Sequence, residues 1–117
     1  MNTDFVEMNV LFDFYGSLLT GKQMDIFKMY YMDDYSLGEI SQELNISRQG
    51  VYDSLKRAES VLRFYEEKLG LVKKYNIESE RINKIKFIID KAKNDISDEK
   101  ALKVLDDIQK ELEGIEL

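Results

Sequence analysis

The sequence predicts an all-α protein that is built around a helix-turn-helix. The 117 residues include no proline and only six glycines, a composition that favours helices. Apolar residues recur at three- and four-residue intervals, as they do on one face of a helix. The stretch SLGEISQELNISRQGVYDSLKR, residues 36–57, has the pattern of two helices joined by a tight turn. We therefore expect a tri-helical core over residues 20–70 without a β-wing, with one helix before it and a helical hairpin behind it.

Two helices are expected ahead of the motif. The first covers residues 4–16 and buries one face, which carries Phe5, Met8, Phe12 and Tyr15. Thr20 opens the second helix, and Gln23 three residues later completes a capping box. The apolar side of this second helix consists of Met24, Phe27, Tyr30 and Tyr31.

The motif itself has clear start and stop signals. Ser36 and Glu39 form a second capping box at the start of the short first helix. Asn45 tolerates the left-handed conformation that ends a helix before a sharp turn, and Ile46 fills the space between the two helices. Ser47 then caps the second helix of the motif.

The second helix of the motif is long, and we expect it to stop near Gly70. Residues on its predicted buried stripe alternate at four- and three-residue steps: Val51, Leu55, Ala58, Leu62, Tyr65 and Leu69. Residues on the other side point outward, at the centre or on the flanks: Gln49, Tyr52, Asp53, Lys56, Arg57, Ser60 and Arg63.

The C-terminal part predicts an antiparallel helical hairpin after a short junction at residues 71–76. Its two apolar seams run from Ile82 to Ile96 and from Ala101 to Ile115, and Ser97 caps the last helix. We expect one domain at residues 1–76 and the hairpin at residues 77–117. The seams close on the N-terminal helices or pair with a second copy, and their narrowness favours a homodimer.

Composition argues against an enzyme. The chain has no histidine and no cysteine, and it contains no phosphate-binding glycine loop. No cofactor or metal site is expected, since the pairs Asp33-Asp34 and Asp106-Asp107 lack the spacing of a Ca²⁺ loop. An all-oxygen metal enzyme is the remotest of the alternatives. Apolar runs are too short to span a bilayer, and the N-terminus lacks the pattern of a signal peptide, so we expect a cytoplasmic location.

The charge distribution is unusual for a DNA-binding protein. The net charge is −6, and residues 36–63 carry four acidic and four basic side chains. Because counterion release by Lys and Arg supplies most non-specific DNA affinity, the motif is a weak electrostatic attractor of DNA.

Six residues are nevertheless the candidates for nucleic-acid binding. They lie at the start and on the outward side of the motif's second helix: Ser47, Arg48, Gln49, Tyr52, Lys56 and Arg57. Arg48 and Lys56 are suited to phosphates, and Gln49 is suited to a base edge. The alternative is that this helix is purely architectural. The aromatic cluster at Phe12, Phe14, Tyr15, Phe27, Tyr30, Tyr31 and Tyr35 is predicted to be core rather than a base-stacking platform.

Three stretches resemble the YlxM family of small bacterial helix-turn-helix proteins. They are LFDFYGSLLTGKQ (residues 11–23), YYMDDYSLGEISQELNISRQGVYDSLKR (30–57) and YEEKLGL (65–71), and the resemblance covers roughly residues 5–75. The segment SLGEISQELNISRQGV is also similar, more distantly, to region 4 of sigma-70-type factors. Gly50 stands where family members often carry alanine.

This resemblance implies a helical, DNA-binding-like protein with a regulatory part in the signal recognition particle pathway, an assignment based on gene neighbourhood. Two functions follow as expectations. The first is a sequence-specific DNA regulator that uses the six candidate residues. The second is an adaptor for a protein or ribonucleoprotein component of that pathway, with the acidic balance favouring a basic partner and the hairpin supplying the grip.

Overall fold

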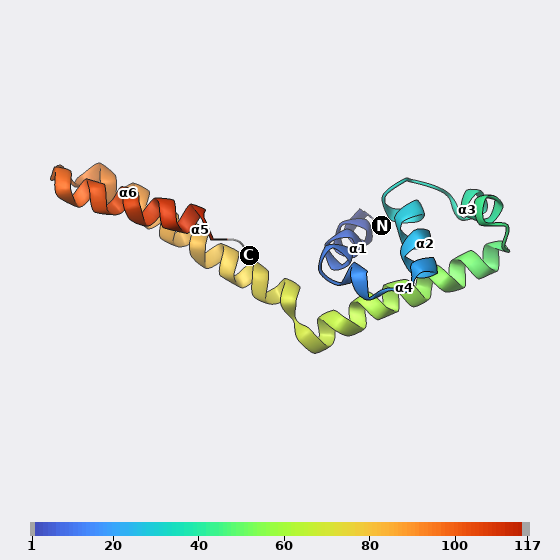
Figure 1. Ribbon diagram of the computed structural model, residues 1–117. Coiled ribbons are helices and arrows are strands. Elements are labelled where there is room, and N and C mark those ends of the chain that lie inside the picture. The colour runs from blue at the N-terminus through green and yellow to red at the C-terminus, as the bar shows by residue number, and fades with distance from the viewer. Residues whose placement is uncertain (1, 116–117) are drawn as a thin grey trace. The chain divides into compact units, whose positions relative to one another are not determined.

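The computed structural model describes residues 2–115, and over these residues the chain is all-α, as predicted (Figure 1). Its helices are α1 (Asn2–Tyr15), α2 (Gly21–Tyr31), α3 (Leu37–Leu44), α4 (Arg48–Leu69), α5 (Leu71–Asp95) and α6 (Glu99–Glu113). A single 3-10 turn, η1 (Gly16–Leu18), follows α1. The chain forms two compact units, the first ending at Val72 and the second beginning at Lys73.

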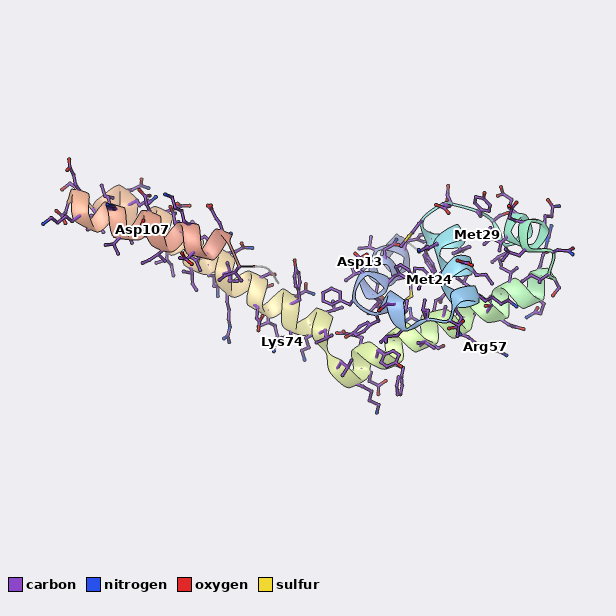
Figure 2. The ribbon with its side chains drawn as sticks, in the orientation of Figure 1. Asp13, Met24, Met29, Arg57, Lys74 and Asp107 are labelled. Carbon is purple, nitrogen blue, oxygen red and sulfur yellow. The ribbon has the colours of Figure 1, made fainter. Side chains whose placement is uncertain are left out.

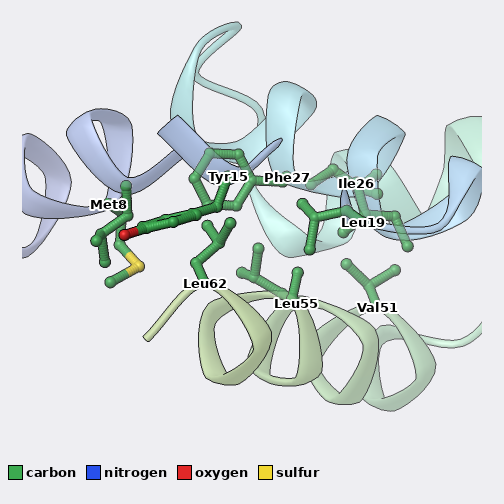
Figure 3. Packing of buried hydrophobic residues seen from close by; sticks show 11 residues of the cluster. Met8, Tyr15, Leu19, Ile26, Phe27, Val51, Leu55 and Leu62 are labelled. Atoms are coloured by element: carbon green, nitrogen blue, oxygen red, sulfur yellow. The ribbon is translucent and has the colours of Figure 1, made fainter. Parts of the chain in front are cut away.

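The core of the first unit lies between α4 and the helices along one side of it (Figures 1 and 3). The predicted stripe of α4 is buried at Val51, Leu55, Ala58 and Leu62. The facing side chains come from α1, α2, α3 and the turn after α1: Met8, Leu11, Tyr15, Leu19, Ile26, Phe27 and Ile40. Tyr65 packs against this cluster, whereas Leu69, which was also expected on the stripe, is 56% exposed at the last position of α4.

The predicted aromatic cluster is part of the core or packs against it, as expected. Tyr15 and Phe27 are fully buried, and the rings of Phe12 and Phe27 stack with their centroids 4.8 Å apart. The remaining members of the predicted cluster are partly buried against the core: Phe14, Tyr30, Tyr31 and Tyr35. Ring faces that are occupied by other rings are not available to bases, so these aromatics do not form a stacking platform.

Local capping explains where α2 begins. The Thr20 hydroxyl accepts from the backbone N–H of Gln23, and the Gln23 side chain accepts from the N–H of Thr20. This reciprocal pair is the capping box that the sequence predicted. The first helix was predicted to begin two residues later and end one residue later than α1 does, a difference that is ordinary for helix ends.

The expected junction at residues 71–76 is wrong, because α5 begins at Leu71. Gly70 adopts the left-handed conformation, with φ of +62°, and ends α4. The first free N–H groups of α5 then find distant partners. Leu71 donates to the Tyr15 hydroxyl at 3.1 Å, and Val72 donates to Oε1 of Glu66 at 3.0 Å. No capping residue is needed at the junction, so no local signal marks this helix start.

The second unit is a hairpin of α5 and α6, which lie side by side (Figure 1). Asp90 accepts from Gln109 at 2.6 Å, and Lys93 further along α5 pairs with Asp106 earlier on α6, so the two helices are antiparallel. Ser97 was predicted to cap α6, but the cap is Asp98, whose carboxylate accepts from the N–H of Ala101 at 3.1 Å. Ser and Asp are comparable caps, which is why composition did not separate these neighbours.

Among the helices of residues 2–115, none is long and apolar enough to cross a membrane.

Candidate nucleic-acid interface

The turn between α3 and α4 fixes the geometry of the candidate site. Asn45 ends α3 in the left-handed conformation, with φ of +56°, as predicted. The Ser41 hydroxyl donates to the carbonyl of Ile46 at 2.5 Å, and Ile46 packs against the core. The Ser47 hydroxyl accepts from the N–H of Gly50 at 2.9 Å and caps α4. The turn therefore sets both the start and the direction of α4.

The N-terminal turn of α4 presents Arg48 beside α3. The Arg48 side chain is exposed and extends over Gly38, so closely that a Cβ at Gly38 would lie 3.0 Å from a guanidinium nitrogen. Gly50 leaves the next turn bare, and a Cβ there would lie 3.1 Å from the Ser47 hydroxyl. The absence of a side chain at Gly50 thus leaves the Ser47 cap uncrowded and the backbone open to approach.

The centre of the outward side of α4 is polar. Gln49 and Asp53 are both exposed, and the Gln49 amide donates to the Asp53 carboxylate at 2.9 Å. This contact between residues four positions apart holds the Gln49 side chain along the helix. An amide in this position offers both a donor and an acceptor to a base edge once the Asp53 bond opens.

On one flank, Tyr52 and Lys56 form a pair. The Lys56 ammonium lies 5.5 Å from the centre of the Tyr52 ring, and Tyr52 is 44% exposed. The same ammonium lies 3.4 Å from Oε1 of Glu59. Glu59 is buried and also accepts from the Tyr31 hydroxyl at 2.8 Å. The buried Glu59 carboxylate therefore fixes the position of the Tyr52–Lys56 pair.

On the opposite flank, Arg57 lines a polar hollow of about 340 Å³ between α4 and the start of α2. Arg57 is exposed (labelled in Figure 2). Lys22 from α2 lines the same hollow, together with Ser54. The Asp53 carboxylate and the Thr20 hydroxyl line the hollow as well. Because the two cations outnumber the one carboxylate, the hollow has a net positive charge that suits a phosphate.

The structure thus distributes the six candidate residues around the exposed part of α4. Ser47 and Arg48 lie at its start, Gln49 lies at the centre, Tyr52 and Lys56 lie on one flank, and Arg57 lies on the other.

Sequence reasoning missed Lys22 and Glu59. Nothing in the local sequence around Lys22 indicates that the start of α2 faces Arg57. Glu59 had a usable signal, because it lies four residues after buried Leu55 and so borders the same stripe. Arg63 lies on the same flank of α4 as Lys56, two turns further along the helix, and its side chain is 3.9 Å from Glu7 of α1.

The two aspartate pairs have structural positions. Asp34 adopts φ of +62° in the turn before α3, a conformation that short acidic residues tolerate. The Lys93 ammonium, by hydrogen bond and by charge, lowers the pKa of Asp106 below its ordinary value. Within residues 2–115, no group of three acidic side chains is arranged to hold a metal ion.

Two helices joined at a left-handed asparagine, with the second helix exposing polar side chains, define a protein of the helix-turn-helix class. The chain belongs to the family described as "Putative helix-turn-helix protein, YlxM / p13 like", whose model matches residues 3–111. The match extends past the core and covers most of the hairpin.

Named relatives are similar over most of their length. A UPF0122 protein of Thermoanaerobacter sp. (strain X514) is 54% identical over 117 residues, which is all of both chains. The UPF0122 protein YlxM of Bacillus subtilis (strain 168) is 52% identical over 88 residues, 75% of this chain and 80% of that one. A UPF0122 protein of Geobacillus sp. (strain WCH70) is 45% identical over 112 residues, 95% and 96% of the two chains.

Proposed function

We propose that the protein is a DNA-binding regulatory protein that contacts the duplex through the exposed side of α4. The observation that carries this proposal is the arrangement of α3 and α4. The turn at Asn45 directs the start of α4 outward, and the four cations of α4 that precede Phe64 all lie on exposed positions. A helix presented in this way enters the major groove in helix-turn-helix proteins.

The candidate residues then take distinct roles. Arg48 and Lys56 contact phosphates from the start and one flank of α4, and Arg57 with Lys22 contacts a phosphate from the other flank. Gln49 contacts a base edge, with a preference for adenine, because an amide pairs with the N6 and N7 atoms of that base. Tyr52 packs against the sugar-phosphate backbone beside Lys56, and the N–H groups at the Ser47 cap face the duplex.

Charge limits the affinity that this surface gives. The chain carries 23 acidic and 17 basic side chains, so its long-range field opposes approach to DNA. Local cations must compensate for this field at contact distance. We therefore expect binding that is detectable at low salt, falls steeply with added salt, and depends on few phosphate contacts.

The test is fluorescence anisotropy of the whole protein with labelled, pooled genomic duplex fragments at several salt concentrations. Lys56→Ala is expected to weaken binding to all fragments alike and to reduce the salt slope by about one. Lys68→Ala is the matched control, because Lys68 is an exposed lysine at the far end of the same helix. Equal effects of the two substitutions, or no binding at low salt, would overturn the proposal.

A role in the signal recognition particle pathway is the second part of the proposal. It rests on the resemblance to the YlxM family alone, because no residue or motif of the chain indicates a pathway. The alternative function within that pathway is an adaptor that binds a protein or ribonucleoprotein component instead of DNA. The hairpin favours this alternative, since several apolar residues there are exposed: Ile85, Ile88, Val104 and Ile108.

Capture of purified signal recognition particle, reconstituted from its protein and RNA, separates the adaptor from the DNA regulator. An adaptor that grips through the hairpin loses capture with Ile85→Lys/Ile108→Lys and keeps it with Lys56→Ala. A DNA regulator without an adaptor role captures no particle, and its DNA affinity depends on Lys56 rather than on the hairpin. The hairpin substitutions thus separate the two functions: they abolish particle capture by an adaptor, and they leave the DNA affinity of a regulator unchanged.

We also propose that the hairpin forms a homodimer. Two helices alone cannot enclose their seams. In α5 and α6 the seam residue Ile89 is buried, while the seam residues Ile85 and Ile108 stay 43% and 42% exposed. A second copy offers the same apolar surface, so a two-fold pairing covers both copies at once. A dimer would also give two α4 helices for two half-sites on DNA.

The remaining parts of the proposal concern chemistry and location. A helix-turn-helix family suggests a role in binding, and we propose that the protein catalyses no reaction and needs no cofactor. Such a protein acts where the chromosome and the signal recognition particle are, so we propose a cytoplasmic location.

A further inference from the structure

A hollow of about 230 Å³ opens on the first unit beside α4. Its lining comes from four helices: Phe5 of α1, Tyr30 and Tyr31 of α2, Leu37 of α3, and Tyr52, Leu55, Lys56, Glu59 and Arg63 of α4. Cavities of about 150 Å³ already hold a benzene ring. This hollow is therefore large enough for a planar ligand, and it is distinct from the polar hollow at Arg57.

A buried carboxylate is the polar centre of this hollow. Glu59 is only 6% exposed, and each of its oxygens has one neighbour, the Tyr31 hydroxyl at 2.8 Å and the Lys56 ammonium at 3.4 Å. A carboxylate has about four acceptor positions, two on each oxygen. One position on each oxygen is therefore open. Two adjacent acceptors of this kind match a ligand edge that carries two parallel N–H donors.

Tyr31 is the hydrogen-bond donor that holds this carboxylate in place. Burial, and then the hydrogen bond to Glu59, raise the pKa of Tyr31 far above its ordinary value, so the phenol stays protonated and donates at neutral pH. The ring of Phe5 lies against those of Tyr30 and Tyr31, with centroids 5.6 and 4.8 Å away. These contacts hold the aromatic wall rigid beside Glu59.

The rim of the hollow is cationic. Lys56 and Arg63 both line it and both are exposed. The carboxylate of the lining is Glu59, 3.4 Å from Lys56, and Glu7 of α1, outside the lining, lies 3.9 Å from Arg63. A cationic ligand would meet repulsion at this rim. A ligand with a negative group outside the hollow and a flat ring inside it would satisfy the cations, the aromatic walls and the carboxylate together.

We propose that this hollow binds a guanine nucleotide, with the base edge donating to Glu59 and the phosphate facing Lys56 and Arg63. Guanine is the base whose N1–H and N2–H₂ groups give two adjacent donors. Adenine places the N1 acceptor beside its amino group, and that acceptor would face a carboxylate oxygen. Binding of this nucleotide does not depend on whether the protein binds DNA.

A nucleotide bound in the hollow would affect DNA binding at the candidate nucleic-acid surface. Tyr52 and Lys56 belong to both sites, and a nucleotide phosphate at Lys56 takes the charge that a DNA phosphate would use. The nucleotide is therefore expected to compete with DNA, so the hollow would be a regulatory site.

The test is isothermal titration of the full-length protein with GMP, with AMP and ribose 5-phosphate as comparison ligands and guanidinium chloride as a cationic probe. GMP is expected to bind at least about tenfold more tightly than AMP, in line with the discrimination that a paired base edge provides. No heat of binding with GMP at about 1 mM, a level that would detect even weak sites, would overturn the proposal. Equal affinities for GMP and AMP, or binding of guanidinium in preference to GMP, would overturn it too.

Two variants make the test specific. Glu59→Gln keeps the shape and an acceptor for Tyr31, and it is expected to weaken GMP at least about tenfold and to remove the preference over AMP. Glu67→Gln, an exposed residue on the same helix, is the control and should leave both affinities unchanged. Tyr52→Ala alters an exposed wall residue and is expected to weaken GMP and AMP alike. Unchanged GMP affinity in both Glu59→Gln and Tyr52→Ala would exclude this hollow as the site.

Discussion

The hydroxyl of Tyr15 donates to Oε1 of Glu66 at 2.6 Å, and this contact joins α1 to the end of α4. The same hydroxyl accepts from the N–H of Leu71, and the same carboxylate oxygen accepts from the N–H of Val72. Tyr15 is 1% exposed. Burial, and then Glu66, raise the pKa of Tyr15 above its ordinary value, so the phenol is a permanent donor at neutral pH. Tyr15, buried and distant in sequence, and half-buried Glu66 thus together cap α5.

Tyr15→Phe is expected to destabilise the first unit by about 1–3 kcal/mol, the usual cost of leaving buried polar groups without a partner. The free energy of unfolding in urea measures this change. Tyr35→Phe is the control, since within the described residues the Tyr35 hydroxyl has no hydrogen-bond partner, and it should cost much less. Equal losses in the two variants would contradict the capping role of Tyr15.

Gly70→Ala is expected to cost about 1–2 kcal/mol, because the left-handed conformation at φ of +62° brings a Cβ close to the following carbonyl. Gly21→Ala is the matched control. Gly21 has ordinary backbone angles and no atom within 4 Å of the place where a Cβ would lie, so alanine there should be neutral or slightly stabilising. Thermal unfolding of both variants against the natural sequence measures the difference. A neutral Gly70→Ala would mean that α4 does not end in this conformation in solution.

Stability should fall on acidification, in part through Glu39. Hydrogen bonds to the backbone and side chain of Ser36 lower the pKa of Glu39 in the folded protein. The stabilisation is therefore complete above the pKa of the unfolded chain and is lost as the pH falls through the lower folded value. Glu39→Gln keeps a capping side chain without a titration, so the fall in stability between neutral and acidic pH should be smaller than in the natural protein. Urea unfolding at pH 7 and in acid checks this, with Glu43→Gln on the same helix as the control. An unchanged pH dependence would contradict the capping box.

The proposed homodimer predicts a change in mass by sedimentation equilibrium. Ile85→Lys/Ile108→Lys places charge on the exposed part of the two seams and is expected to yield monomers. Phe87→Lys is the control, because Phe87 is 67% exposed but lies about 160° around α5 from buried Ile89. If the natural protein is monomeric, or if both variants dissociate alike, the seam is not the dimer surface.

The sequence was sufficient where structure is decided by near neighbours. Capping boxes at Thr20 and Ser36, the left-handed turn at Asn45 and the stop at Gly70 all depend on residues within four positions, and each is confirmed. The stripe of α4 was also predictable as far as Tyr65, because residues spaced three and four apart lie on the same side of a regular helix.

Sequence reasoning was wrong or silent where a distant residue decides the outcome. Leu71 begins a helix because Tyr15, 56 positions earlier, accepts from it. Glu59 can be buried because Tyr31, 28 positions away in the sequence, donates a hydrogen bond to it. Arg57 and Lys22 line the same hollow although they too are far apart in the sequence. None of these pairings has a local signature. The outward-facing residues of α4 could therefore be identified from the sequence, but their neighbours from α1 and α2 could not.

The most direct measurement is a map of amide chemical shifts in the ¹⁵N-labelled protein during titration with a duplex recovered from the bound genomic fragments. If DNA binds to the exposed side of α4, we expect the chemical-shift changes to concentrate at residues 47–57 and at Lys22, whereas α6 stays unperturbed. The shifts should shrink as salt is added, because phosphate contacts release counterions. Shifts confined to residues 73–115, or no shifts at a duplex concentration that saturates anisotropy, would contradict the assignment of the exposed side of α4 as the surface that binds DNA.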